Sequence, residues 1–166
     1  MKSIFIYISF VSIFIASTGF SQNRLKSLPN TQIEDLNGNT IETSSLANEE
    51  GLMVISFWAT WCKPCIIELN ELQDVYPDWK EEANIKIVAI SIDDSRSSSK
   101  VPGFVRGKGW EFDFYLDKNS DLKRAMNITD VPHSFLVNKE GKIVWQHAGY
   151  SLGDEEILFE EILKNL

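Results

Sequence analysis

Residues 53–65 read MVISFWATWCKPC and contain both cysteines of the chain, Cys62 and Cys65. The apolar run before the cysteines is rich in β-branched and aromatic residues, which is typical of a buried strand over residues 52–59. The residues after them repeat at helical spacing, with one face formed by Cys65, Leu69, Leu72 and Tyr76. The stretch therefore predicts a central strand and a helix that meet at the cysteine pair.

The expected helix N-terminus gives the cysteine pair a chemical role. Pro64 fits the first helical turn, where its missing N–H breaks no hydrogen bond. The free N–H groups and the positive end of the helix dipole favour a thiolate at Cys62. A disulfide across two intervening residues closes a very small loop and restricts the unfolded chain little. We therefore interpret the pair as redox-active rather than as a structural crosslink.

The composition is that of one acidic globular domain. The chain has 166 residues, of which 43% are hydrophobic, and this is enough to build one core. Its formal net charge of −8 argues against nucleic acid as a partner.

Residues 1–21 have the layout of a secretory signal. Lys2 precedes an apolar stretch, and small residues, including Gly19 and Ser21, lead to an expected cleavage site after Ser21. The apolar stretch is shorter than the roughly 20 residues of a membrane-spanning helix, so an uncleaved anchor is the alternative. We predict a single domain over residues 22–166, located in the periplasm or another extracytoplasmic compartment.

The rest of the chain alternates between strand and helix patterns. A turn at Asn37-Gly38 predicts an N-terminal β-hairpin. The helix after Cys65 is expected to kink or restart at Pro77, and Asp154 is expected to cap the last helix. Between them we predict strands over 85–92, 112–116, 133–137 and 142–147, and helices over 101–108 and 119–126. This order predicts an α/β sandwich with a mixed sheet.

Several motifs resemble one known family. Residues 57–65 (FWATWCKPC) resemble the active-site segment of thioredoxin-like proteins, and Glu68 follows three residues later. Residues 88–93 precede an inserted helix and strand, and residues 131–142 (VPHSFLVNKEGK) resemble a cis-proline strand and hairpin. Together they are similar to the TlpA/ResA type of extracytoplasmic thiol–disulfide oxidoreductase. The resemblance implies a thioredoxin-like fold, with an N-terminal β-hairpin and a helix–strand insertion between the central βαβ unit and the cis-proline hairpin.

The resemblance also implies roles for individual residues. Cys62 would be the exposed nucleophile and Cys65 the buried resolving thiol. Pro132 would be cis and would lie beside the disulfide, and the backbone of Val131 would bind an incoming peptide as an added strand. The residues expected to contact substrate are therefore Trp61, Lys63, Pro64, Val131 and Pro132.

Glu68 is the expected proton partner of the cysteines. It matches an acidic position near the active site of the ResA type, and Cys65 needs a base before it can attack. The alternative is a solvated carboxylate on the first part of the helix. Ser56 stands where the cytoplasmic thioredoxins have a buried acid, and this departure leaves proton transfer to Glu68 or to water.

The function that these features predict is reduction of protein disulfides by dithiol–disulfide exchange, with no cofactor beyond the Cys62–Cys65 pair. The resemblance implies extracytoplasmic thiol or disulfide proteins as partners, such as apocytochrome c, and a membrane thiol–disulfide protein as electron donor. A copper-delivery module with Cys62, Cys65 and His133 as ligands is the alternative, since thiolates and imidazole suit copper. His133 departs from the family, which more often has threonine there. A peroxidase is disfavoured because Ile55 stands where that class has an activating proline.

Overall fold

The computed structural model describes residues 26–166, so the predicted signal segment lies outside the described residues. Seven strands are present: β1 (Gln32–Asp35), β2 (Thr40–Glu42), β3 (Met53–Trp58), β4 (Lys86–Ser91), β5 (Asp113–Leu116), β6 (His133–Val137) and β7 (Ile143–Ala148). The helices are α1 (Lys63–Ala83), α2 (Val101–Lys108), α3 (Asp121–Ala125) and α4 (Asp154–Lys164), with short 3-10 turns at Thr43–Leu46 and Ser98–Lys100. The predicted elements are therefore present, with ends shifted by a few residues.

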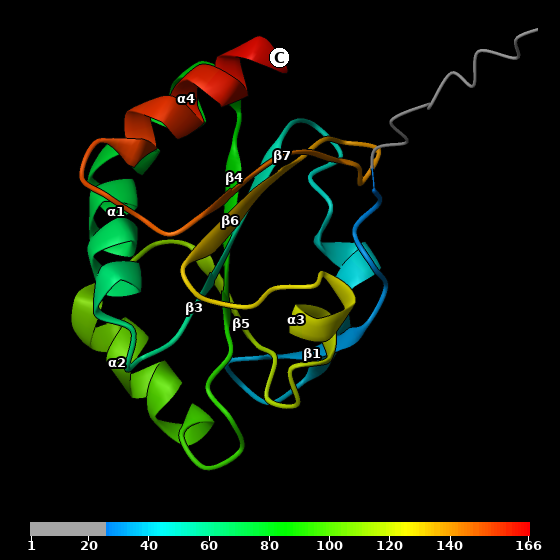
Figure 1. Cartoon of the computed structure of the whole chain (residues 1–166), viewed down its shortest axis with the longest axis vertical. Coiled ribbons are helices and arrows are strands. Elements are labelled where there is room, and N and C mark those ends of the chain that lie inside the picture. The colour runs from blue at the N-terminus through cyan, green and yellow to red at the C-terminus, as the bar shows by residue number, and fades with distance from the viewer. Residues whose placement is uncertain (1–25) are drawn as a thin grey trace, which may run out of the picture.

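The strands form one mixed sheet in the order β2-β1-β5-β4-β3-β6-β7. β3 runs parallel to β4 and antiparallel to β6, and the predicted hairpins pair β1 with β2 and β6 with β7. Helices α1, α2 and α4 cover one face of the sheet, and α3 lies on the other side (Figure 1). This is the mixed α/β sandwich that the sequence predicts, with α2 and β5 as the inserted helix and strand.

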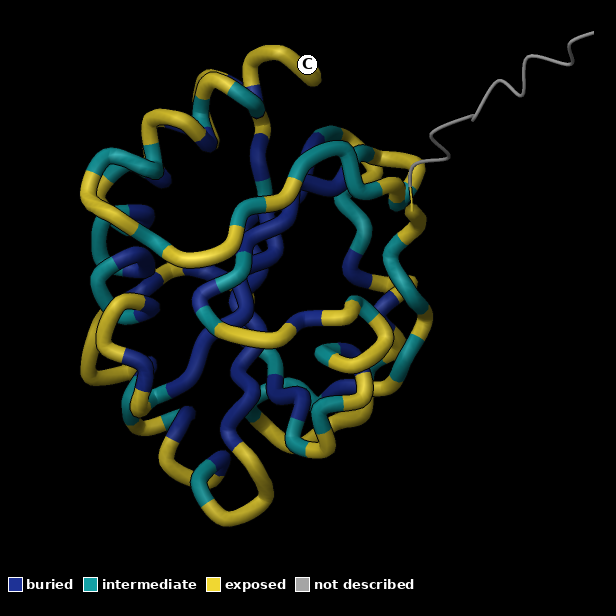
Figure 2. Tube along the Cα trace, in the orientation of Figure 1, coloured by how far each residue is buried: buried dark blue, intermediate teal, exposed yellow. Residues whose placement is uncertain are grey.

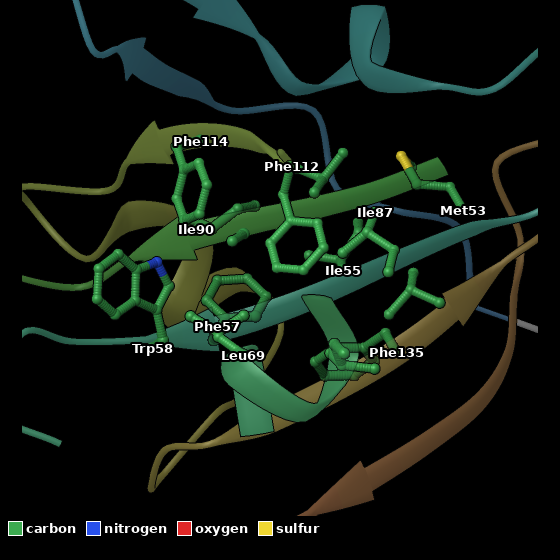
Figure 3. Close-up of a cluster of buried hydrophobic side chains, with 14 of the residues drawn as sticks. Met53, Ile55, Phe57, Trp58, Leu69, Ile87, Ile90, Phe112, Phe114 and Phe135 are labelled. Carbon is green, nitrogen blue, oxygen red and sulfur yellow. The ribbon is translucent and has the colours of Figure 1, made fainter. Parts of the chain in front are cut away.

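The core is centred on β3, whose six residues are all buried (Figure 2). A strand covered on both faces needs a nearly continuous apolar run, which residues 53–58 supply. Buried apolar side chains lie on both faces of the sheet around β3 and β4, and Leu69 of α1 is among them (Figure 3). Trp58 lies against three rings of the inserted segment, Phe104, Trp110 and Phe114, at centroid distances of 5.5–5.9 Å. Aromatic side chains of the inserted segment therefore cover the end of the core that lies next to the cysteines.

Helix α1 differs from the prediction at Pro77. It continues without interruption from Lys63 to Ala83, with Pro77 inside it. An interior proline costs about 3 kcal/mol in an exposed helix. Here Tyr76 and Trp79 on either side are buried, and Trp79 stacks on Phe159 of α4 with the ring centroids 4.9 Å apart. This tertiary packing offsets the lost hydrogen bond.

The last helix also begins differently from the prediction. Gly153 is the N-cap residue of α4, with φ 99°, and Asp154 is the first helical residue. The Asp154 carboxylate instead accepts a hydrogen bond from the Ser151 N–H, at 2.7 Å. Within residues 26–166, no helix has both the length and the apolar character needed to cross a membrane.

Candidate active site

Cys62 and Cys65 form a disulfide at the N-terminus of α1. Cys62 is the N-cap residue, and its Sγ accepts a hydrogen bond from the Cys65 N–H at 3.3 Å. This donor and the helix dipole are in place to stabilise negative charge on the Cys62 sulfur once the bond opens. The Cys62 sulfur, which the sequence predicts to be the nucleophile, therefore lies at the positive end of the 21-residue helix α1.

The expectation of an exposed Cys62 is wrong for this oxidised form. Cys62 is 4% exposed and Cys65 is fully buried. The Cys62 Sγ lies 3.6 Å from the carbonyl oxygen of Val131, which belongs to the loop before β6. Neither sulfur of a disulfide carries hydrogen, so this is a van der Waals contact here and becomes available as a hydrogen bond only after reduction. In the oxidised form Val131 therefore covers part of the Cys62 sulfur.

The loop before β6, which is distant from the cysteines in the sequence, forms another part of the site. The Val131–Pro132 peptide bond is cis, as the resemblance implies. The Pro132 carbonyl accepts a hydrogen bond from the Gly149 N–H at 2.8 Å, which ties this loop to the end of β7. The register of β3 against β6 pairs Phe57 with His133, and this pairing brings Pro132 to the end of β3 from which the cysteine loop starts.

Three of the residues predicted to contact substrate are exposed around the buried cysteines. Lys63 and Pro64 are exposed in the first turn of α1. Trp61 is 66% exposed, immediately before Cys62. These three side chains are therefore free to contact a partner that approaches the disulfide.

Glu68 is buried, so the alternative of a solvated carboxylate is wrong. Its residue is 5% exposed, and its carboxylate accepts hydrogen bonds from Ser56 Oγ at 3.0 Å and from Ser134 Oγ at 2.7 Å. Burial raises the pKa of Glu68 to about 7, against the lowering effect of the two serine hydroxyls; the nearby charge of Asp154 adds to the rise. The carboxyl can therefore take up and release a proton near neutral pH.

The two serines that hold Glu68 are register partners. Ser56 of β3 lies directly opposite Ser134 of β6, and both are buried. From the sequence, Ser56 is expected only to stand in place of a missing acid, and Ser134 has no predicted role. The signal was present, because each serine is a small polar residue inside an otherwise apolar core strand. This chain thus has no acid on the central strand. Its buried acid is Glu68 on α1, which accepts hydrogen bonds from the Ser56 and Ser134 hydroxyls.

Asp93 holds the segment just before the cysteines and was not predicted. It is fully buried, two residues after the end of β4. Its carboxylate accepts hydrogen bonds from the Thr60 N–H at 2.8 Å, the Thr60 Oγ1 at 2.7 Å and the Ser91 Oγ at 2.8 Å. Thr60 lies two residues before Cys62, so Asp93 fixes the path of the chain into the disulfide.

Replacing Asp93 by alanine is expected to destabilise the fold by about 1–3 kcal/mol, because buried donors at Thr60 and Ser91 lose their acceptor. The free energy of unfolding in urea measures this loss. Asp93→Asn is the matched control, since its amide can still accept from the Thr60 N–H and donate to the Thr60 hydroxyl. If the two variants are equally stable, the hydrogen bonds of Asp93 do not hold this segment.

His133 has its own contacts. Its ring stacks on Phe135 with centroids 4.5 Å apart and planes 2° apart. Burial lowers the pKa of His133, and a hydrogen bond with Gln146 acts in the opposite direction. Over residues 26–166 the structure groups no three His, Cys, Asp or Glu side chains where they could hold a metal ion. The geometry therefore gives the copper alternative no support.

Comparison of the sequence with known proteins agrees with this site. The model of the AhpC/TSA family matches residues 25–146. The thiol-disulfide oxidoreductase ResA of Bacillus thuringiensis subsp. konkukian is 30% identical over 141 residues, which are 85% of this chain and 77% of that protein. ResA of Bacillus subtilis is 34% identical over 116 residues, which are 70% of this chain and 62% of that protein.

Solved structures with the same architecture are also known. An uncharacterized thioredoxin-like protein from Porphyromonas gingivalis is 42% identical, with a TM-score of 0.74 over 82% of this chain and 90% of that one. StoA from Bacillus subtilis is 23% identical, with a TM-score of 0.64 over 82% of this chain and 97% of that one, and shows the shared fold. The fold is therefore thioredoxin-like, as the sequence motifs imply.

Proposed function

The chain belongs to the AhpC/TSA family and to the ResA-type thiol–disulfide oxidoreductases, and from this premise we propose that it works as a reductase of protein disulfides outside the cytoplasm. One observation carries the proposal. The Cys62–Cys65 pair sits at a helix N-terminus, and the buried carboxyl of Glu68, with its pKa near 7, follows three residues further along the same helix. A nucleophile and a base for the second thiol are therefore present on one element.

The proposed reaction proceeds in two exchanges. The Cys62 thiolate attacks one sulfur of the partner disulfide, and the other partner sulfur leaves with the electron pair. Glu68 then takes the proton of Cys65, and the Cys65 thiolate attacks Cys62. The bond between Cys62 and the partner breaks, the Cys62–Cys65 disulfide forms, and the partner leaves as a dithiol. Glu68 suits this role because a base works best with a pKa near the working pH.

Substrate binding is assigned to the exposed residues around the disulfide and to the loop before β6. Trp61, Lys63 and Pro64 would pack against the partner chain, and Trp61 supplies the largest apolar area. The backbone of Val131, held in place by cis-Pro132, would pair with the partner in an extended conformation, so that recognition depends only partly on sequence.

The compartment and the partners are proposed from the sequence. The signal-like layout of residues 1–21 supports an extracytoplasmic location, with a cleaved signal or a retained anchor. In such a compartment a reductase needs electrons from across the membrane, and a membrane thiol–disulfide protein would supply them. The haem-binding cysteines of apocytochrome c are the proposed substrates, and the exchange needs no further cofactor.

The reduction potential of the Cys62–Cys65 pair tests the proposed direction of electron flow. We expect a value near that of thioredoxin, about −270 mV, when the purified domain is equilibrated with glutathione or dithiothreitol redox buffers. A value near that of the oxidant DsbA, about −120 mV, would contradict a reductase and indicate an oxidase. Reduction of insulin by the protein in the presence of dithiothreitol checks the same assignment kinetically.

A further inference from the structure

A small cavity lined by both polar and apolar side chains adjoins Glu68, and neither cysteine takes part in it. Its volume is about 10 Å³, close to the minimum that holds one water molecule. Leu72, one turn further along α1 than Glu68, lines it. Strands β6 and β7 and helix α4 supply the other walls, with Ser134, His147 and Asp154 among the polar ones.

Two residues that are paired across β6 and β7 lie between Glu68 and the surface. Ser134 of β6 lies directly opposite His147 of β7, so their side chains share the face of the sheet that carries Glu68. The Ser134 hydroxyl donates to Glu68 Oε1, and its oxygen can accept a second hydrogen bond. The side chain of His147 is 40% exposed, and its Nε2 lies 3.3 Å from Asp154 Oδ2. Glu68, Ser134 and His147 thus follow one another from a buried carboxyl to an imidazole in contact with solvent.

From this geometry we propose that His147, oriented by Asp154, is a proton-relay residue that connects Glu68 with solvent through Ser134 and one water in the cavity. The inference rests on the proposed role of Glu68 as the base for Cys65. A neutral imidazole has one donor and one acceptor nitrogen, so it can receive a proton on one side and release one on the other.

The reaction leaves a proton on Glu68 that such a path can carry to solvent. In the second exchange the Cys65 proton moves to Glu68, the Cys62–Cys65 bond forms, and the partner sulfur leaves with the electron pair. Glu68 can return that proton to Cys65 when the disulfide is reduced again, or it can release the proton to solvent before then. A partner bound over Trp61 and Cys62 covers the face of the site from which solvent would otherwise approach. The cavity between β6, β7 and α4 lies on another side and stays open to proton exchange.

Several charged side chains lie around the cavity. Tyr150 donates a hydrogen bond to Glu155, and Asp154 and Glu155 of α4 face the cavity. Glu71 of α1 adds a further negative charge near Tyr150. The α4 side of the cavity is therefore lined by acidic side chains. Ser56 bonds to Glu68 from β3, the strand on the other side of Ser134.

Two variants of His147 test the relay in multiple-turnover reduction of insulin with dithiothreitol. His147→Phe keeps a ring that can stack on Trp145, as His147 does now, but it removes both nitrogens. We expect turnover to fall about tenfold, less than the 10²–10⁴-fold that a positioned acid or base itself contributes. We expect His147→Ala to be equally slow, and imidazole added to the buffer to restore its rate because the vacated space admits the ring.

The controls separate this inference from the proposed function. Gln146→Ala changes the adjacent position of β7, whose side chain points to the opposite face, and should leave turnover unchanged. The first exchange, followed as the rapid release of coloured thiolate from dithiobis(nitrobenzoate), should be unaffected by either His147 variant. Wild-type turnover in His147→Phe, or a slow His147→Ala that imidazole does not restore, would overturn the relay. If Glu68→Gln also turns over normally, the role of Glu68 fails as well.

Discussion

Replacing Cys62 by serine is expected to abolish disulfide reduction, with a loss in turnover of at least about 10³-fold, because a hydroxyl at this position forms no thiolate and no mixed disulfide. The structure gives the reason for choosing Cys62. Its Sγ is the one that accepts the Cys65 N–H at the helix N-terminus, and Cys65 has no exposed surface. The measurement is the initial rate of insulin reduction with dithiothreitol as electron source.

Cys65→Ser is the matched comparison for this prediction. It keeps the Cys62 thiolate, so the first exchange should proceed and then stop at the mixed disulfide. Mass spectrometry after mixing the variant with a disulfide-containing peptide should find one peptide bound covalently through Cys62. If Cys62→Ser instead accumulates the covalent product, the assignment of nucleophile and resolving thiol must be reversed.

Glu68→Gln is expected to slow the second exchange about 10²-fold at neutral pH, the lower end of the contribution of a positioned general base. With Glu68 present, the rate should rise with pH through the carboxyl's pKa of about 7 and then level off, as the base form becomes populated. In the variant the rate should keep rising with pH, because only ionisation of the thiol itself remains. Stopped-flow release of the second coloured thiolate from dithiobis(nitrobenzoate) measures this profile.

The same residue should make the stability of the oxidised protein depend on pH. The pKa of Glu68 is about 7 in the fold and 4.5 ordinarily, so between these values the folded state holds a proton that the unfolded state has lost. This contribution to stability is complete below pH 4.5 and is lost as pH rises through 7. At 1.36 kcal/mol per pH unit, the difference between 7 and 4.5 corresponds to about 3 kcal/mol.

Unfolding of wild type and Glu68→Gln in urea at several pH values measures that difference. Relative to wild type, the glutamine variant should gain stability as pH rises from about 4 to about 8, by up to about 3 kcal/mol. Asp74→Asn, an exposed change on the same helix, should show no such trend. The oxidised form is used because its disulfide cysteines do not titrate. Parallel curves for wild type and Glu68→Gln would mean that Glu68 is not buried as a titrating acid.

The elements of the fold could be predicted because their patterns are local. The apolar run before Cys62 and the apolar face after Cys65 lie within a few residues, and the turns at Asn37-Gly38 and before Pro132 are marked by their residue types. Pro77 and Asp154 were predicted less well for the same reason. A proline and an acid have strong local preferences, but the packing of Trp79 on Phe159 and the glycine conformation at Gly153 outweigh them here.

The active site likewise has features that follow from local sequence and features that depend on contacts between distant segments. The sequence alone determined the disulfide chemistry, since two cysteines at a strand-to-helix junction are a local feature, and it indicated Glu68 by its distance from Cys65 along one helix. Only the tertiary structure decided the state of that glutamate. Its burial between Ser56 and Ser134 depends on the register of β3 against β6, and these serines are 78 positions apart in the chain. The cover of Val131 over Cys62 and the bonds from Asp93 to Thr60 likewise join distant segments. Such contacts are set by the register of the sheet and by side-chain packing, and no spacing within the sequence encodes them directly.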